Sequence, residues 1–185
     1  MATARNVAVL VGSLRKESFS RKVAKALVAL APPALKLEIL EIGQLPLYNQ
    51  DDDANPPAAS AAFKQRVGQA DAVIFVTPEY NRSVPGVLKN AIDIASRPYG
   101  HSAWSGKPGG VISVSPGALG AFGANHALRQ SLVFLNVPAM AQPEAYISHA
   151  ATLFDDKGTL TSESTREFLQ KYLAAFAQWV ERNAK

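Results

Sequence analysis

The chain has 185 residues, 48% of them hydrophobic and 18% charged, and carries a formal net charge of +4. This composition excludes a disordered protein, and we expect one globular domain over residues 1–185. Cysteine is absent, which excludes disulfides, thiolate metal sites and thiol redox chemistry. No apolar run approaches the ~20 residues that cross a bilayer, no signal peptide is recognisable, and basic residues are dispersed outside one turn. We therefore expect a cytoplasmic protein with neither a membrane nor a nucleic acid as its partner.

Strand and helix patterns alternate along the whole chain, which predicts an α/β fold with a parallel sheet. Residues 7–11 are all apolar and form a predicted strand that is buried on both faces. The first half continues with a helix over about 20–30, an edge strand at 35–39, a long loop at 43–57, and a short helix carrying Phe63 and Val67.

The second half repeats the pattern. We expect a central strand at 72–76, a helix over 84–95 with Pro85 in its first turn, a strand at 110–114, a helix over 124–135 and a strand within 137–147. Pro138 places that last strand near a sheet edge. The final helix is expected to start at a capping box formed by Ser164 and Glu167, and its regularly spaced apolar stripe is expected to be core.

Right-handed crossovers and the edge position of the second strand predict a doubly wound, five-stranded parallel sheet of order 2-1-3-4-5. In such sheets ligands bind beyond the carboxyl ends of the strands, where the strand order reverses. The loops expected to meet there are 12–20, 77–85 and 115–123.

The loop after the first strand has the composition of a phosphate site. It carries Gly12, Ser13, Arg15, Ser18 and Ser20 and runs directly into a helix. Free backbone N–H groups at a helix N-terminus bind anions together with hydroxyls and a guanidinium. Five Lys and Arg residues against one Glu between residues 14 and 25 favour the same charge. The alternative is an ordinary turn with a serine cap and solvated lysines.

The residue types in this loop reduce the range of phosphate ligands that it could bind. Neither the dinucleotide fingerprint nor the glycine-rich loop of nucleotide triphosphatases is present. Serines in place of those glycines suit a terminal monophosphate better than a pyrophosphate, and the phosphate of FMN fits that description. In a chain without cysteine, electron transfer needs a bound organic cofactor.

The two other loops suit a flavin ring. Residues 77–85 combine a rigid turn, an aromatic ring, an amide and successive backbone donors, which could serve the face and the pyrimidine edge of the ring. Residues 115–120 have little side-chain bulk and allow the backbone to approach a ligand. Each loop alone could be a plain connection, but together at one edge they favour a flavin site.

Two segments carry a family resemblance, GSLRKESFSRK at 12–22 and TPEYNRSVPGVLKNAID at 77–93. They closely resemble the NADPH-dependent FMN reductase family, in its quinone and chromate reductase branch, and the resemblance extends over nearly the whole chain. It implies a flavodoxin-like fold, bound FMN, and NADPH or NADH as co-substrate. It also implies electron transfer to small acceptors, namely quinones and in some cases chromate or azo compounds.

The resemblance also assigns cofactor-binding residues to the three loops. Those of the phosphate loop are Ser13, Arg15, Ser18, Phe19 and Ser20. Those of the ring-binding loop are Pro78, Glu79, Tyr80 and Asn81, with Arg82 beside them, and those at the polar edge of the ring are Ser115 and Gly117.

Four positions depart from the family pattern. Glu17 stands where glycine is common, Ser20 where asparagine is frequent, and Arg82 where many members have an aromatic residue. His126 stands where a tyrosine often lies near a subunit contact.

The resemblance implies ping-pong turnover, in which a nicotinamide delivers hydride to flavin N5 and leaves before an acceptor takes its place. Backbone N–H groups near the pyrimidine edge would stabilise the reduced flavin, so no catalytic side chain is expected. One alternative is a flavodoxin-type electron carrier without a nicotinamide site, although carriers of that fold tend to be acidic. Another is a regulatory module that has lost the flavin.

No metal site is expected. The acidic run at 51–53 lies in a polar loop and is interpreted as solvated, and the spacing of His101, His126 and His149 fits no metal motif. Each histidine is therefore interpreted as structural or exposed.

Apolar residues on two predicted helices indicate self-association. They are Val84, Leu88 and Ile92 on one helix and Leu128, Leu132, Val133, Phe134 and Leu135 on the other. This is more apolar surface than one sheet face readily covers, which predicts a homodimer or a homotetramer. The alternative is that both helices are buried within one subunit.

Overall fold

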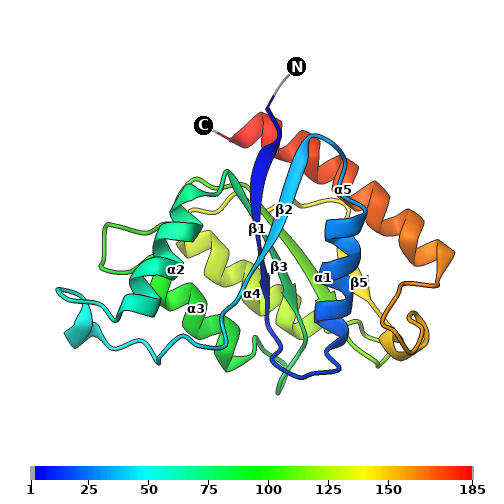
Figure 1. Ribbon diagram of the computed structural model, residues 1–185, viewed down its shortest axis with the longest axis horizontal. Coiled ribbons are helices and arrows are strands. Elements are labelled where there is room, and N and C mark those ends of the chain that lie inside the picture. Colours follow the sequence, from blue (N-terminus) through cyan, green and yellow to red (C-terminus); the bar gives the residue numbers. More distant parts are fainter. Residues whose placement is uncertain (1–2, 185) are drawn as a thin grey trace.

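The computed structural model describes residues 3–184. Five parallel strands form one sheet of order β2-β1-β3-β4-β5, as predicted. The strands are β1 (Arg5–Val11), β2 (Leu35–Leu40), β3 (Ala72–Thr77), β4 (Gly109–Val114) and β5 (Ala145–Ile147). The helices are α1 (Phe19–Ala29), α2 (Ala58–Gln69), α3 (Gly86–Ser96), α4 (Phe122–Phe134) and α5 (Glu163–Asn183), with short 3-10 helices at Gln50–Asp52 and Ala150–Thr152 (Figure 1).

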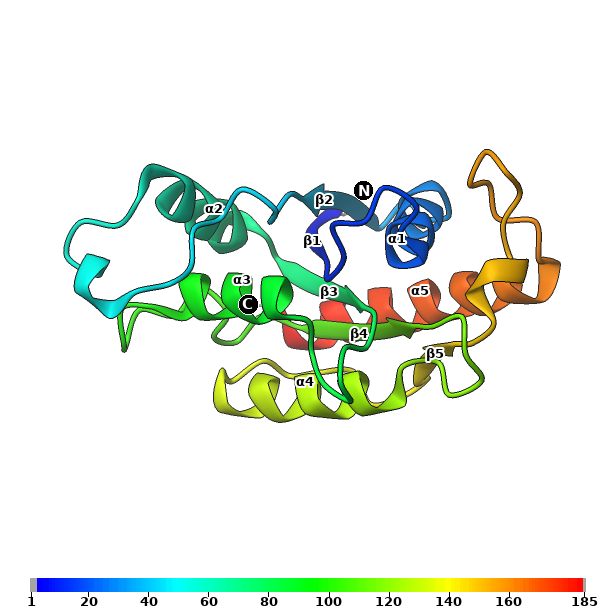
Figure 2. The same cartoon turned by 90° about the horizontal axis from the view of Figure 1, so that it is seen from below.

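Helices cover both faces of the sheet, so β3 and β4 are buried along their whole length. In β1, Val7, Val9 and Val11 pack with α1 and α5 on one face. Ala8 and Leu10 point the other way and pack with α2, α3 and α4. The loops that follow β1, β3 and β4 lie along the lower edge of the molecule in Figure 1 and face the viewer in Figure 2. The doubly wound, flavodoxin-like architecture thus brings the three predicted loops to one edge.

The fifth strand is short and lies at the end of its predicted range, because β5 begins only at Ala145. The preceding stretch meets the sheet at one isolated bridge between Gly109 and Ala139. Pro138 and Pro143 lack the N–H that a continuous ladder would need. The strand predicted within 137–147 is therefore confirmed, and it occupies only the last three residues of that range.

Two helix starts differ from prediction. Ser162, and not Ser164, caps α5, since Ser162 Oγ accepts from Thr165 N at 3.4 Å. Ser164 already lies inside the first turn, and Pro85 precedes α3 instead of lying within it. The apolar stripe of α5 is core as predicted, with Leu169, Tyr172, Leu173, Phe176 and Val180 buried.

The apolar residues expected to form a self-association surface are mostly inside the subunit. Leu88 and Ile92 of α3 are 0% and 2% exposed. On or beside α4, Leu128, Leu132 and Leu135 are likewise buried, whereas Val133 and Phe134 are 81% and 73% exposed. The predicted surface is therefore reduced to one end of α4. Among residues 3–184, no helix combines the length and the apolar character needed to cross a membrane.

Candidate functional site

The loop after β1 places three serines at the N-terminus of α1. Ser18 caps the helix, with its Oγ accepting from Arg21 N at 3.1 Å. Ser18 and Ser20 are 2% exposed and Ser13 is 5% exposed. Gly12 N donates to Val76 O at 2.9 Å and holds the start of the loop against β3. The three serines are therefore almost fully buried between the end of β1 and the start of α1.

Donors in this loop remain available to a ligand. Within residues 3–184, the N–H groups of residues 13–20 donate no hydrogen bond to the protein. Every fully buried side-chain nitrogen or oxygen in the same range has a partner. Because neither the Ser13 nor the Ser20 hydroxyl has one, both oxygens must reach the surface. This cradle of free amides and hydroxyls at a helix N-terminus fits a phosphate group.

The charges around the cradle are partly paired with one another. Lys22 Nζ lies 2.9 Å from Glu17 Oε2, and Arg21 makes two 2.7 Å hydrogen bonds to Glu41. The hydrogen bond from Lys22 holds the pKa of Glu17 below its usual range. Arg15 is exposed and makes no ion pair among the described residues, so its guanidinium is the one free to meet an anion. The carboxylate that replaces the family's glycine is thus neutralised by its neighbour.

The second loop is a tight hairpin. Tyr80 and Ser83 exchange backbone hydrogen bonds of 3.1 and 2.9 Å, and the two residues between them, Asn81 and Arg82, have φ of +50° and +65°. Two consecutive left-handed residues define a type I′ turn. Tyr80 remains 53% exposed and the Arg82 side chain 78% exposed. The turn therefore presents an aromatic ring and a cation to solvent.

Glu79 has a role within the protein that the sequence does not reveal. Its Oε2 accepts from Ala124 N at 3.0 Å, in the first turn of α4. The N-cap residue of that helix, Ala121, offers no side-chain cap, so the carboxylate from the second loop replaces one. A side chain on Gly123 would approach the same oxygen to 2.9 Å. The Glu79 side chain thus anchors the loop to α4.

The third loop follows β4 and is shaped by serines. Ser115 Oγ accepts from Gly117 N at 3.0 Å, and Ser115 N donates to Ile147 O at 2.9 Å. Two residues that the sequence analysis missed, Ser113 and Asn125, lie fully buried beneath this loop. In the sequence, the only signs of a buried polar pair are a serine in a central strand and an asparagine inside a helix. Neither feature by itself indicates burial or a role in a site.

The structure brings the predicted residues together at one edge. The first and second loops lie close together, since a Cβ on Gly12 would lie 3.1 Å from Pro78 Cδ. Glu79 joins the second loop to the first turn of α4, the helix that follows the third loop. Phe19 is half-buried at the start of α1, with Lys22 Nζ 5.7 Å from its ring centroid. The site therefore contains a phosphate cradle, an exposed aromatic ring and backbone-lined loops side by side.

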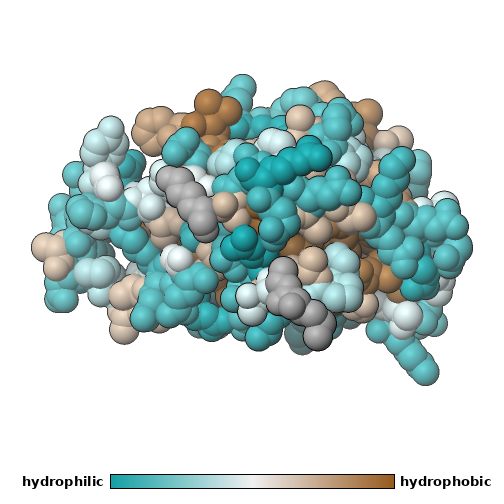
Figure 3. Space-filling view, turned by 90° about the horizontal axis from the view of Figure 1, so that it is seen from above, coloured by the Kyte–Doolittle hydropathy of each residue, from teal (hydrophilic) through white to brown (hydrophobic). Residues whose placement is uncertain are grey.

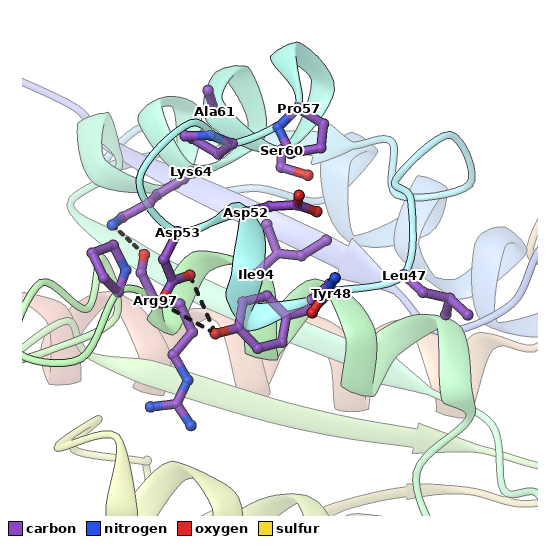
Figure 4. A pocket seen from close by; sticks show the side chains of 13 residues that line it. Leu47, Tyr48, Asp52, Asp53, Pro57, Ser60, Ala61, Lys64, Ile94 and Arg97 are labelled. Atoms are coloured by element: carbon purple, nitrogen blue, oxygen red, sulfur yellow. Dashed lines mark hydrogen bonds between the residues drawn. The ribbon is translucent and has the colours of Figure 1, made fainter.

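A separate hollow of about 70 Å³ lies under the 43–57 loop, away from this edge (Figure 4). Its walls include Leu47, Pro57 and Ile94, and Tyr48 Oη donates to Asp53 at 3.2 Å within it. None of the predicted cofactor-binding residues lines it. In residues 3–184, no group of three or more His, Asp or Glu side chains is placed to hold a metal ion.

Comparisons with known proteins match the whole chain. The profile of the family described as NADPH-dependent FMN reductase matches residues 5–152. A quinone reductase of Pseudomonas putida is 63% identical over 184 residues, which cover 99% of this chain and 98% of that one. A 2-hydroxy-1,4-benzoquinone reductase of a Burkholderia species is 49% identical over 177 residues, or 96% and 97% of the two chains.

A solved structure agrees with both the fold and the family. FerB of Paracoccus denitrificans, a flavoenzyme NAD(P)H:(acceptor) oxidoreductase, superposes with a TM-score of 0.92 at 45% identity, covering 98% of this chain and 100% of that one. Together with the phosphate cradle and the flavodoxin-like sheet, these matches mean that the chain belongs to the NADPH-dependent FMN reductase family, whose cofactor is FMN and whose co-substrate is a nicotinamide nucleotide.

Proposed function

We propose that the protein is an NAD(P)H-dependent quinone reductase built as one flavodoxin-like domain with FMN in the three-loop site. The observation that carries this proposal is the open cradle at α1, where the hydroxyls of Ser13 and Ser20 and the N–H groups of residues 13–20 remain unused by the protein. The names of the relatives at 63% and 49% identity support a quinone as the electron acceptor.

The residues of each loop have distinct tasks in this proposal. Ser13, Arg15 and Ser20 bind the phosphate, while Ser18 and Phe19 shape the helix start that presents it. Residues 78–82 lie along the ring, and the backbone around Ser115 and Gly117 faces its polar edge. Bound FMN supplies the capacity to accept a hydride and pass on two electrons. The amide donors at the polar edge stabilise the negative charge that reduction adds.

A nicotinamide nucleotide and a quinone use the same open face in turn. Arg82 lies at the tip of the exposed hairpin, and its nearest carboxylate oxygen, on Glu79, is 3.9 Å away. A guanidinium held this loosely is available to a phosphate of the incoming nucleotide. Because acceptance of electrons needs only access to the ring, chromate and azo compounds are further acceptors to assay.

The absorbance spectrum of the purified protein, followed by anaerobic reduction, tests the proposal. We expect a flavin spectrum that NADPH or NADH bleaches and that menadione restores. A flavin spectrum that neither nucleotide bleaches would indicate an electron carrier, and a colourless protein that binds no added FMN would indicate a module without the cofactor. Reduction by each nucleotide separately gives the preference between NADPH and NADH.

We also propose that the protein is a homodimer or a homotetramer. Val133 and Phe134 give an exposed apolar end to α4, and Leu119 and Phe122 at its other end are 65% and 52% exposed. In Figure 3 a brown patch stands out from a largely hydrophilic face over the C-terminal end of α4. Exposed apolar residues at the two ends of one helix favour association.

Light scattering at micromolar concentration tests this assembly. We expect a mass of at least twice 19.7 kDa, reduced by Val133→Ser with Phe134→Ser. A fully active monomer would contradict it. The expected location is the cytoplasm, where reduced nicotinamide nucleotides are available, and fractionation of cells tests that expectation.

A further inference from the structure

Two fully buried polar side chains lie directly beneath the third loop. Ser113, near the end of β4, and Asn125, in α4, are both 0% exposed. Ser113 Oγ donates to Gly120 O at 2.7 Å, and Asn125 Nδ2 donates to Ser113 Oγ at 3.2 Å. Polar groups buried this deeply are costly unless their hydrogen bonds replace those lost to water. The shortest of these bonds leads to the Gly120 carbonyl of the loop, and longer contacts of 3.4 and 3.5 Å lead from Ser113 Oγ and Asn125 Nδ2 to Ala145 O of β5.

Arg129 extends this chain of donors away from the loop. Its Nε donates to Asn125 Oδ1 at 2.9 Å, and its Nη1 donates to Met140 O at 3.1 Å. Every bond from Arg129 through Asn125 and Ser113 to Gly120 therefore runs in the same direction. Hydrogen bonds in such a series polarise one another, and this one starts at a permanent cation.

The peptide at the end of the series is held in a fixed position. Gly120 has φ of +55°, and a Cβ there would lie 2.9 Å from Tyr146 C. The N–H of the Gly120–Ala121 peptide belongs to Ala121 and donates no hydrogen bond to the protein within residues 3–184. A carbonyl that accepts a strong hydrogen bond makes the N–H of its own peptide a better donor. The series thus strengthens a free donor in the third loop.

We propose that Arg129, Asn125 and Ser113 are positioning residues that fix the Gly120 peptide and favour the reduced, negatively charged state of FMN. This inference rests on the proposed assignment of the third loop to the polar edge of the ring. None of the three residues needs to touch the cofactor, because they act through the loop backbone.

Ser113→Ala and Arg129→Met interrupt the series at two points. We expect each to weaken binding of oxidised FMN about three- to tenfold, the effect of about one hydrogen bond. Binding of reduced FMN should weaken at least threefold more, so the midpoint potential becomes more negative. The potential depends on the ratio of the two dissociation constants, and a residue that only shapes the loop would weaken both equally and leave it unchanged.

Two substitutions are matched controls. Ser60→Ala removes another buried serine, on α2, and Arg166→Met removes an arginine on α5 whose 2.7 Å bond goes to Leu160 O, which lies outside the loop. Neither should change the potential. Ser113→Thr keeps a hydroxyl and should restore most of the wild-type value.

The measurements are fluorescence titration of the apoprotein with FMN and spectroelectrochemical titration of the holoprotein, with thermal melting of each apoprotein to verify folding. A potential that is unchanged in the folded variants overturns the proposal. If one variant does not fold, the other decides alone. A wild-type apoprotein that binds no FMN would instead overturn the proposed function, so the two failures are distinguishable.

Discussion

The first and second loops of the site follow equivalent strands at the same edge of the sheet, yet their shapes have different origins. The first loop is organised by its own neighbours: Ser18 caps the helix that follows it, and Glu17 pairs with Lys22. The second loop is held by two left-handed residues and by a carboxylate that caps a helix more than forty residues later, Glu79 bonding to Ala124. A site can thus combine a locally encoded loop with one that exists only in the folded protein.

Removing the ligand donors of the first loop should have the largest effect. We expect Ser13→Ala and Arg15→Ala each to weaken FMN binding roughly 10- to 100-fold, since a hydrogen bond to a charged group contributes about 1.5–3 kcal/mol. Apoprotein stability should hardly change, because neither side chain has a partner among the described residues. Fluorescence titration and thermal melting measure the two effects. Lys25→Ala, which removes a charge from α1 beyond its first turn, is the control. Unchanged affinity in both variants would place the phosphate elsewhere.

Glu79→Ala should behave in the opposite way and destabilise the apoprotein itself. Among residues 3–184, the bond to Ala124 N is the only side-chain cap of α4, and its loss should cost about the 0.5–2 kcal/mol that caps contribute. Chemical denaturation of the apoprotein measures this change. Glu79→Gln keeps an acceptor oxygen and should recover most of the stability. An apoprotein that is equally stable in all three forms would mean that the second loop is shaped by its turn alone.

Comparing Arg82→Gly with Arg82→Ala separates the effect of backbone strain at residue 82 from the effect of losing its positive charge. Releasing a non-glycine residue from φ of +65° should raise the free energy of unfolding by about 0.5–1 kcal/mol, after allowing for the entropy of glycine. Arg82→Ala keeps the Cβ and should not stabilise the protein. Both variants lose the guanidinium, so both should raise the KM for NADPH more than that for menadione. Equal effects on the two KM values would remove Arg82 from the nucleotide site.

The smallest expected effect concerns the ion pair between Arg21 and Glu41 beside the first loop. The hydrogen bond from Arg21 lowers the pKa of Glu41 in the folded protein. A lowered folded pKa adds stability above the ordinary Glu pKa of about 4.3 and loses it as the pH falls below that value. Since Glu41 is 65% exposed, Arg21→Gln should cost only about 0.5 kcal/mol at neutral pH. Urea denaturation should show this difference at pH 7 and a smaller one at pH 3.

The residue pattern alone determined most of the architecture and the first loop. Apolar runs of strand length and an edge strand of alternating polarity specified the sheet order, because burial on one or both faces demands those patterns. The cradle was equally predictable, since Ser13, Ser18 and Ser20 lie within one short segment that runs from the end of β1 into the first turn of α1. A site formed by neighbouring residues can be predicted without knowing which distant segments contact it.

Only the tertiary structure decided the features that depend on contacts between distant segments. The fifth strand is short because its prolines cannot complete a ladder beside β4, and the apolar side chains of α3 are buried because the sheet covers them. Glu79 acts as a helix cap, and Ser113 with Asn125 forms a buried series beneath a loop, only because β3, β4 and α4 meet there. Hydrogen bonds between segments far apart in sequence leave no periodic pattern, so their partners become known only once the chain is folded.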